Sequence, residues 1–113
     1  MRKYIIAILV FFSFGSFAQT IGGIGAQLFI DTAGSFTMPR IQSLVPNSPA
    51  YDSLRATDYI ISVNGASCKN KTVAEVVGMI RGISGTKVHI IVADTKQGNR
   101  PREYDLTRVT LNV

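Results

Sequence analysis

The chain has 113 residues, with 12 lysines and arginines, 7 acidic residues, one histidine and one cysteine. A chain of this length can bury one modest core, so we expect a single small domain. The basic excess is mild and no basic stripe is interleaved with aromatic residues, which excludes a typical nucleic-acid-binding surface. Cys68 has no partner for an internal disulfide; a lone thiol can pair between chains or be reactive, but we expect Cys68 to be a small, partly buried apolar filler. No histidine–cysteine cluster suggests a metal, so we expect no cofactor to bind.

The first 18 residues have the pattern of a secretory signal peptide. Arg2 and Lys3 precede an apolar run over residues 4–14, and Ser16 and Ala18 stand at the −3 and −1 positions of a cleavage site. The apolar run is shorter than the ~20 residues that span a bilayer. We therefore expect residues 1–18 to be removed, leaving residues 19–113 as one periplasmic or secreted domain. The alternative is an uncleaved N-terminal anchor, the one case in which we expect membrane contact.

The remaining chain predicts a mainly β fold with helices added (α+β). Residues 24–30 alternate apolar and other side chains, as a half-buried strand does. Further strands are predicted over residues 40–45, ended by Pro46, over 59–63, closed by the turn dipeptide Asn64-Gly65, and over 87–93 and 103–111. Pro49 follows Asn47-Ser48 and predicts a short helical turn. The loop of the last hairpin carries three basic residues, Lys96, Arg100 and Arg102.

One longer helix is predicted over residues 73–81. Thr72 followed by Glu75 forms a capping box, and Val73, Val76, Val77 and Ile80 form one apolar stripe. We expect Gly82 to end this helix in a left-handed conformation, and Gly78 to allow a neighbouring strand or peptide to approach closely.

Four segments carry a family resemblance: Gly23-Ile24-Gly25-Ala26, Asn47-Ser48-Pro49-Ala50, residues 58–65 and residues 72–77. In this order and spacing they resemble a PDZ domain, most closely that of bacterial carboxy-terminal processing proteases, over roughly residues 21–113. The resemblance implies a PDZ-like, partly open barrel of five to six strands with one long and one short helix. The chain departs from the family pattern after Ala50. The segment there is one residue shorter than in the family, and Ser53 and Thr57 stand where the family has two glycines, so we expect altered geometry in this segment.

The resemblance also implies a ligand: the free C-terminus of an extended polypeptide, added as a strand to the sheet. The loop Gly23, Ile24, Gly25 and Ala26 would hold the carboxylate with backbone amides, since consecutive amides form an anion nest. The groove would be formed by Gln27, Leu28, Val73, Val77 and Ile80. Because Val73 and Val77 cannot accept a hydrogen bond from a serine or threonine, apolar tails are expected.

Catalysis is not expected. The Ser/Lys catalytic domain of the processing proteases has no counterpart in this sequence, and His89 lies mid-strand, where we expect it on the solvent face. The predicted function is an exported peptide-binding module that delivers tails to a separate periplasmic protease or an envelope assembly. The alternatives are an assembly module with a vestigial groove, which binds through a sheet edge or the basic hairpin tip, and a detached protease fragment.

Overall fold

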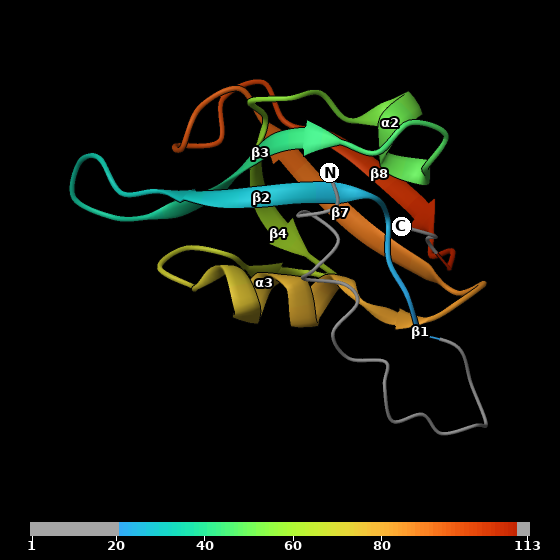
Figure 1. Cartoon of the computed structure of the whole chain (residues 1–113). Coiled ribbons are helices and arrows are strands. Elements are labelled where there is room, and N and C mark those ends of the chain that lie inside the picture. Colours follow the sequence, from blue (N-terminus) through green and yellow to red (C-terminus); the bar gives the residue numbers. More distant parts are fainter. Residues whose placement is uncertain (1–20, 111–113) are drawn as a thin grey trace.

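The short apolar runs of the sequence form an antiparallel sheet, because their side chains alternate between the core and the surface. The computed structural model describes residues 21–110 (Figure 1). Its elements are β1 (Ile21–Gly22), β2 (Ala26–Asp31), β3 (Met38–Leu44), α2 (Pro49–Ser53), β4 (Tyr59–Val63), β5 (Ala66–Ser67), α3 (Val73–Ile80), β6 (Gly82–Ile83), β7 (Lys87–Ala93) and β8 (Arg102–Thr107). The expected mainly β fold with one long and one short helix is confirmed.

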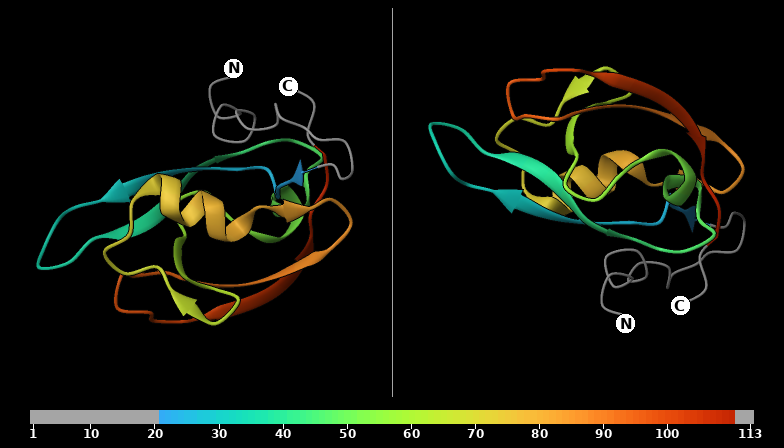
Figure 2. Two further views of the ribbon diagram at one scale, coloured as in Figure 1. Left: turned by 90° about the horizontal axis from the view of Figure 1, so that it is seen from below. Right: turned by 90° about the horizontal axis from the view of Figure 1, so that it is seen from above.

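The main sheet has six strands, in the order β2-β3-β4-β7-β8 with β5 beside β4. β1 and β6 form a separate antiparallel pair, which the sequence did not predict. Seen from below and above, α3 lies beside β2 on one side of the sheet and α2 lies on the other (Figure 2). Within residues 21–110, no helix is long and apolar enough to cross a membrane.

The core lies between the sheet and the two helices. Its largest fully buried side chains come mainly from β3, β4 and β7 and include Ile41, Ile60 and Ile90. Cys68 is also fully buried, and burial raises the pKa of its thiol to about 11. Its burial agrees with the expected apolar filler and is more complete than expected, and a thiol that stays protonated at neutral pH is a poor nucleophile.

Local sequence explains where α3 begins. The backbone amide of Glu75 donates to Thr72 Oγ1 at 3.1 Å, and the amide of Thr72 donates to Glu75 Oε1 at 2.8 Å, so the predicted capping box is confirmed. Val76 and Ile80 of the predicted stripe are buried.

The prediction about Gly82 is wrong, and so is the expectation that a strand of this chain approaches Gly78; close approach of a peptide to Gly78 stays a prediction. Gly82 does not take a left-handed conformation; it begins β6 after an extended Arg81. A Cβ on Gly82 would lie 2.6 Å from Arg108 Cζ, so the glycine makes room for that guanidinium. At Gly78, a Cβ would meet nothing within 4 Å, so no neighbouring segment approaches it closely in the structure.

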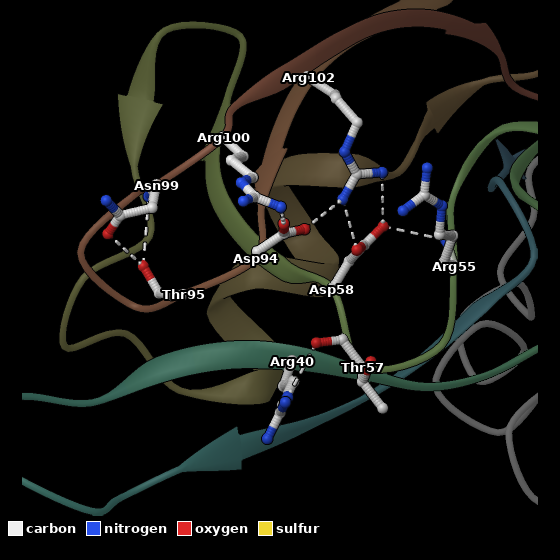
Figure 3. Close-up of polar contacts among 9 residues, drawn as sticks. All are labelled: Arg40, Arg55, Thr57, Asp58, Asp94, Thr95, Asn99, Arg100 and Arg102. Carbon is white, nitrogen blue, oxygen red and sulfur yellow. Dashed lines mark hydrogen bonds and ion pairs between the residues drawn. The ribbon is translucent and has the colours of Figure 1, made fainter.

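In the shortened segment after α2, a residue other than glycine takes the left-handed conformation. Ser53 lies in α2, whereas Thr57 has φ 76°, an unusual value for a β-branched residue. The carbonyl of Thr57 accepts from Arg40 Nε at 2.8 Å (Figure 3). The adjacent Asp58 is buried and accepts from both terminal nitrogens of Arg102, at 2.6 and 3.2 Å. Contacts on both sides of Thr57 therefore hold the unusual backbone.

Candidate functional site

A small pocket lies between the loop formed by residues 23–26 and the C-terminal half of α3. It is lined by Gly23, Ile24, Gly25, Ala26, Leu28, Val77, Ile80 and Arg81. The structure thus brings together seven of the nine residues that the sequence assigned to carboxylate and groove. Arg81 is the one charged residue among these lining residues.

The loop 23–26 presents its amides to one side because its carbonyls are held on the other. The carbonyl of Ile24 accepts from the amide of Ala50 at 2.9 Å, and that of Gly25 accepts from the amide of Val45 at 2.8 Å. In a trans peptide, the N–H points opposite to the C=O of the same plane. The amides of Gly25 and Ala26 therefore point away from the segment 45–50, toward the side on which the pocket lies.

Glycine is required at position 25 for two reasons. Its φ is +89°, a region that side-chain-bearing residues rarely adopt. A Cβ there would also lie 2.2 Å from both Cβ and Oγ of Ser48, which is buried. The motif Asn47-Ser48-Pro49-Ala50 thus supports the loop from behind: Ser48 packs against Gly25 and Ala50 holds the carbonyl of Ile24.

Residues 108–109 form hydrogen bonds to both walls of the pocket, the loop 23–26 and the C-terminal end of α3. The amide and carbonyl of Val109 exchange hydrogen bonds with those of Gly23, each at 3.0 Å. The buried side chain of Arg108 donates from Nε to the carbonyl of Ile80 at 2.7 Å and from Nη1 to Thr86 Oγ1 at 2.9 Å. This role could not be predicted from the sequence, because a lone arginine after a strand has no local pattern that marks it as buried.

Arg81 is the site residue that the sequence missed. It follows the last residue of α3 and adds a positive charge to an otherwise apolar pocket wall. Burial lowers the pKa of its guanidinium to about 10, which still leaves it protonated at neutral pH. The available signal was helical spacing, since Arg81 follows Val77 by four residues and so lies on the same side of the helix.

Two predicted groove residues do not line this pocket. The side chain of Gln27 turns to the opposite face of β2, where its Oε1 accepts from Ser43 Oγ at 2.8 Å. Only the backbone of Gln27 could contact a ligand in the groove. Val73 is half-buried at the start of α3, at the far end of the stripe that carries Val77 and Ile80.

The space beyond the pocket is bounded by an edge strand. β2 stands at the end of the strand order, so in the described part of the chain only β3 pairs with it. α3 lies beside β2 (Figure 1). Leu28 of the strand and Val77 of the helix both line the pocket. An edge strand offers unpaired backbone groups to an added strand.

The basic hairpin tip is not a cluster of solvated charges. Lys96 donates to the carbonyl of Ala33, lies 3.7 Å from a carboxylate oxygen of Asp31 and has a side chain only 11% exposed. Arg102 belongs to β8 and pairs with Asp58 (Figure 3). Arg100 alone of the three extends into solvent, with 85% of its side chain exposed.

His89 lies on the solvent face of the sheet, as expected. Its Nδ1 is 2.8 Å from Asp105 Oδ1 and its Nε2 is 3.2 Å from Glu103 Oε1. Hydrogen bonding to Asp105 raises the pKa of the imidazole, and the charges of Asp105 and Glu103 add to the effect. Among residues 21–110, no group of three or more His, Cys, Asp or Glu side chains could hold a metal ion.

Comparison with known proteins identifies the family of this chain. A family model described as the PDZ domain matches residues 17–93. The carboxy-terminal processing protease CtpA of Bacillus subtilis (strain 168) is 39% identical over 89 residues, which cover 74% of this chain and 18% of that protein. The chain therefore spans a minor part of this relative.

Two solved structures are similar in fold. The photosystem II D1 C-terminal processing protease superposes with a TM-score of 0.73 at 22% identity, covering 88% of this chain and 25% of that one. The PDZ domain of the carboxy-terminal protease from Vibrio cholerae, crystallised in complex with a peptide, gives a TM-score of 0.65 at 26% identity, covering 82% of this chain and 98% of that domain. The similarity is thus to the binding module of such proteases, and this module is not catalytic.

Proposed function

Since the chain belongs to the PDZ domain family, of the type found in carboxy-terminal processing proteases, we propose that it binds the free carboxyl-terminal end of an extended polypeptide. The terminal carboxylate lies on the loop 23–26, and the preceding residues pair antiparallel with the edge of β2. Main-chain pairing supplies affinity, and the pockets for alternate side chains supply selectivity.

One observation carries this proposal: Gly25, Ala26 and Arg81 line the same pocket, and the carbonyls of Ile24 and Gly25 are held on the other side of the loop. Consecutive backbone amides turned to one side favour an anion. A guanidinium in a partly desolvated position adds charge-assisted hydrogen bonds, which are roughly twice as strong as neutral ones. Beside them, Leu28, Val77 and Ile80 offer an apolar surface to the last side chain of the ligand.

The test compares a free-acid apolar hexapeptide with its C-terminal amide. We expect the acid to shift the backbone amide NMR signals of residues 24–28 and to bind at least about tenfold more tightly, which is ~1.4 kcal/mol. Equal binding of acid and amide, or shifts confined to residues 96–102, would instead favour an assembly module that binds through another surface.

Arg81→Gln tests the charge directly. We expect this variant to lose about tenfold in affinity for the acid while its affinity for the amide stays unchanged, because only the carboxylate interacts with the charge. Arg55→Gln is the matched control, since Arg55 is exposed on the loop after α2 and lines no part of the pocket. Gly25→Val is a poor test, because its Cβ would collide with Ser48 as well as block the positive φ.

The proposed ligand is apolar at its last and third-from-last residues. The last faces Leu28, Val77 and Ile80, and the third-from-last faces the start of the α3 stripe, where Val73 offers no hydrogen-bond acceptor. A threonine at that place would lose its hydrogen bonds to water without replacement. We expect an apolar residue there to outbind threonine by about 10–200-fold, and Val73→His to reduce that gap. Unchanged preference in Val73→His would remove the N-terminal end of α3 from the groove.

We also propose that the domain acts after export, on tails presented in the periplasm or outside the cell, and that it delivers them to a separate protease or an envelope assembly. The support is the signal-peptide pattern of residues 1–18, which lie outside the described residues. Intact-mass measurement of the exported protein should give a chain that begins at Gln19. A membrane-bound species that retains Arg2 and Lys3 would show that the segment is an anchor.

A further inference from the structure

The groove has a second end, opposite the loop 23–26. β2 leads away from that loop for six residues, as far as Asp31. α3 begins at Val73, and its C-terminal half lines the pocket. Its N-terminal end lies toward the far end of β2 (Figure 1). If the proposed function holds, a ligand paired along β2 leaves the groove where β2 ends and α3 begins. At one ligand residue per strand residue, this point is about five residues before the C-terminus.

Reciprocal hydrogen bonds fix the structure of this far end. The amide of Asn70 donates to the carbonyl of Thr37 at 2.9 Å, and the amide of Thr37 donates to Asn70 Oδ1 at 3.0 Å. Lys69 Nζ lies 4.8 Å from the centroid of the Phe36 ring, close enough for a cation–π contact. The loop between β2 and β3 is therefore tied to the segment that precedes α3, and the exit of the groove is formed before a ligand arrives.

Positive charge exceeds negative charge at this exit. Lys69 and Lys71 flank Asn70, and neither forms an ion pair with a carboxylate in the described part of the chain. A third lysine, Lys96, reaches the same Phe36 ring at 5.2 Å from the loop between β7 and β8.

The two carboxylates nearby already have partners. Asp31 accepts from the hydroxyl of Tyr59 at 2.5 Å and lies near Lys96, while Glu75 accepts from the amide of Thr72. The other five acidic residues lie on α2, in the loops before β4 and after β7, and on β8: Asp52, Asp58, Asp94, Glu103 and Asp105. Three lysines (Lys69, Lys71 and Lys96) and two carboxylates therefore lie near the exit, which leaves an excess of one positive charge even though Lys71 interacts electrostatically with Glu75.

We propose that Lys69 and Lys71 select polypeptide tails that carry acidic residues about five to eight positions before the C-terminus. The preferred ligand then has two parts, an apolar end held in the pocket and an acidic segment that passes the lysines. This inference rests on the proposed function, because it assumes that the ligand terminus lies on the loop 23–26.

The experiment uses three free-acid decapeptides with the same last five residues, apolar at the last and third-from-last places. They differ only in the four residues before these, which are all Asp, all Asn or all Lys. At low ionic strength we expect the Asp peptide to bind about three- to tenfold more tightly than the Asn peptide, and the Lys peptide more weakly than either. The differences should shrink at about 0.5 M salt, because exposed charges are then screened.

A double variant, Lys69→Gln with Lys71→Gln, should bring the Asp and Asn peptides to equal affinity. Lys87→Gln removes an exposed lysine from the start of β7, away from the groove, and should leave the difference unchanged. Equal binding of the Asp and Lys peptides to the unmodified domain, or an effect of Lys87→Gln as large as that of the double variant, would overturn the inference. A C-terminally amidated form of the Asn peptide separates C-terminal capture from selection by the lysines. Tighter binding of the acid than of the amide reports C-terminal capture, whatever the effect of the upstream charges.

Discussion

Thr57 is the clearest case of a residue held in an unfavourable conformation. A β-branched residue at φ 76° costs on the order of 1–3 kcal/mol, and glycine avoids that cost. We expect Thr57→Gly to raise the free energy of unfolding by about 0.5–2 kcal/mol, after the larger backbone entropy of glycine in the unfolded chain is subtracted. Urea unfolding measures the difference.

Ser53→Gly is the matched control for Thr57→Gly, since both residues stand where the family pattern has glycine. Ser53 ends α2, where glycine is less favourable than serine, so this variant should be destabilised by a few tenths of a kcal/mol. A loss of stability in Thr57→Gly would mean that the side chain of Thr57 contributes more than its backbone costs.

Asp58 stabilises the same segment through a buried ion pair. It accepts two hydrogen bonds from Arg102 and one, at 2.9 Å, from the amide of Arg55. Removing one member of a buried pair leaves the other charge poorly compensated, so Asp58→Ala should lower the free energy of unfolding by about 3 kcal/mol. Asp94→Ala removes the more exposed partner of Arg102 and should cost at most about 1 kcal/mol. Equal losses in thermal unfolding would contradict this ranking.

At the scale of elements, α3 is the best place to change stability without touching the site. Gly78 is exposed and a Cβ on it would meet nothing within 4 Å. Gly78→Ala should therefore stabilise the domain by about 0.5–1 kcal/mol, because alanine loses less backbone entropy in a helix. Peptide affinity should not change. A weaker peptide complex in this variant would show that the ligand approaches Gly78 closely.

Elements whose determinants are local were predicted from the sequence. The capping box and apolar stripe gave α3 to within one residue, and Asn64-Gly65 forms the turn between β4 and β5 with φ 50° and 83°. β1 and β6 were missed because each has two residues and exists only by pairing with the other across 60 residues of chain. The end of the last strand was placed too late, at residue 111, because β8 ends at Thr107 and Val109 pairs instead with Gly23.

The site residues that belong to a contiguous motif were predicted, whereas those brought to the site by tertiary structure were missed. The loop 23–26 and the stripe residues Val77 and Ile80 line the pocket together. Arg108 supports the pocket only through tertiary structure, by its hydrogen bond to the carbonyl of Ile80, and the role of Gly82 depends on Arg108. The position of Gln27 on β2 was right, but the alternation of the strand turns its side chain away from the groove.

At the scale of the whole molecule, three groups with shifted pKa values set the pH range of greatest stability. A hydrogen bond from Tyr59 lowers the pKa of Asp31 below 3.8, and the backbone amide of Thr72 lowers that of Glu75 below 4.5. These two contributions are present above those values and are lost as pH falls through the lowered pKa. Hydrogen bonding to Asp105 raises the pKa of His89 above 6.5. Its contribution is complete below 6.5 and is lost as pH rises through the raised pKa.

Stability should therefore be greatest between about pH 4.5 and 6.5 and should decline on both sides. Urea midpoints measured from pH 3 to 8.5 test this expectation. In His89→Gln the alkaline decline should disappear while the acid decline remains, because glutamine has no proton to lose in this range. Tyr59→Phe should do the reverse, weakening the acid decline by removing the main hydrogen bond that stabilises the Asp31 carboxylate. An alkaline decline that persists in His89→Gln would assign it to groups other than the ion pairs of His89 with Asp105 and Glu103.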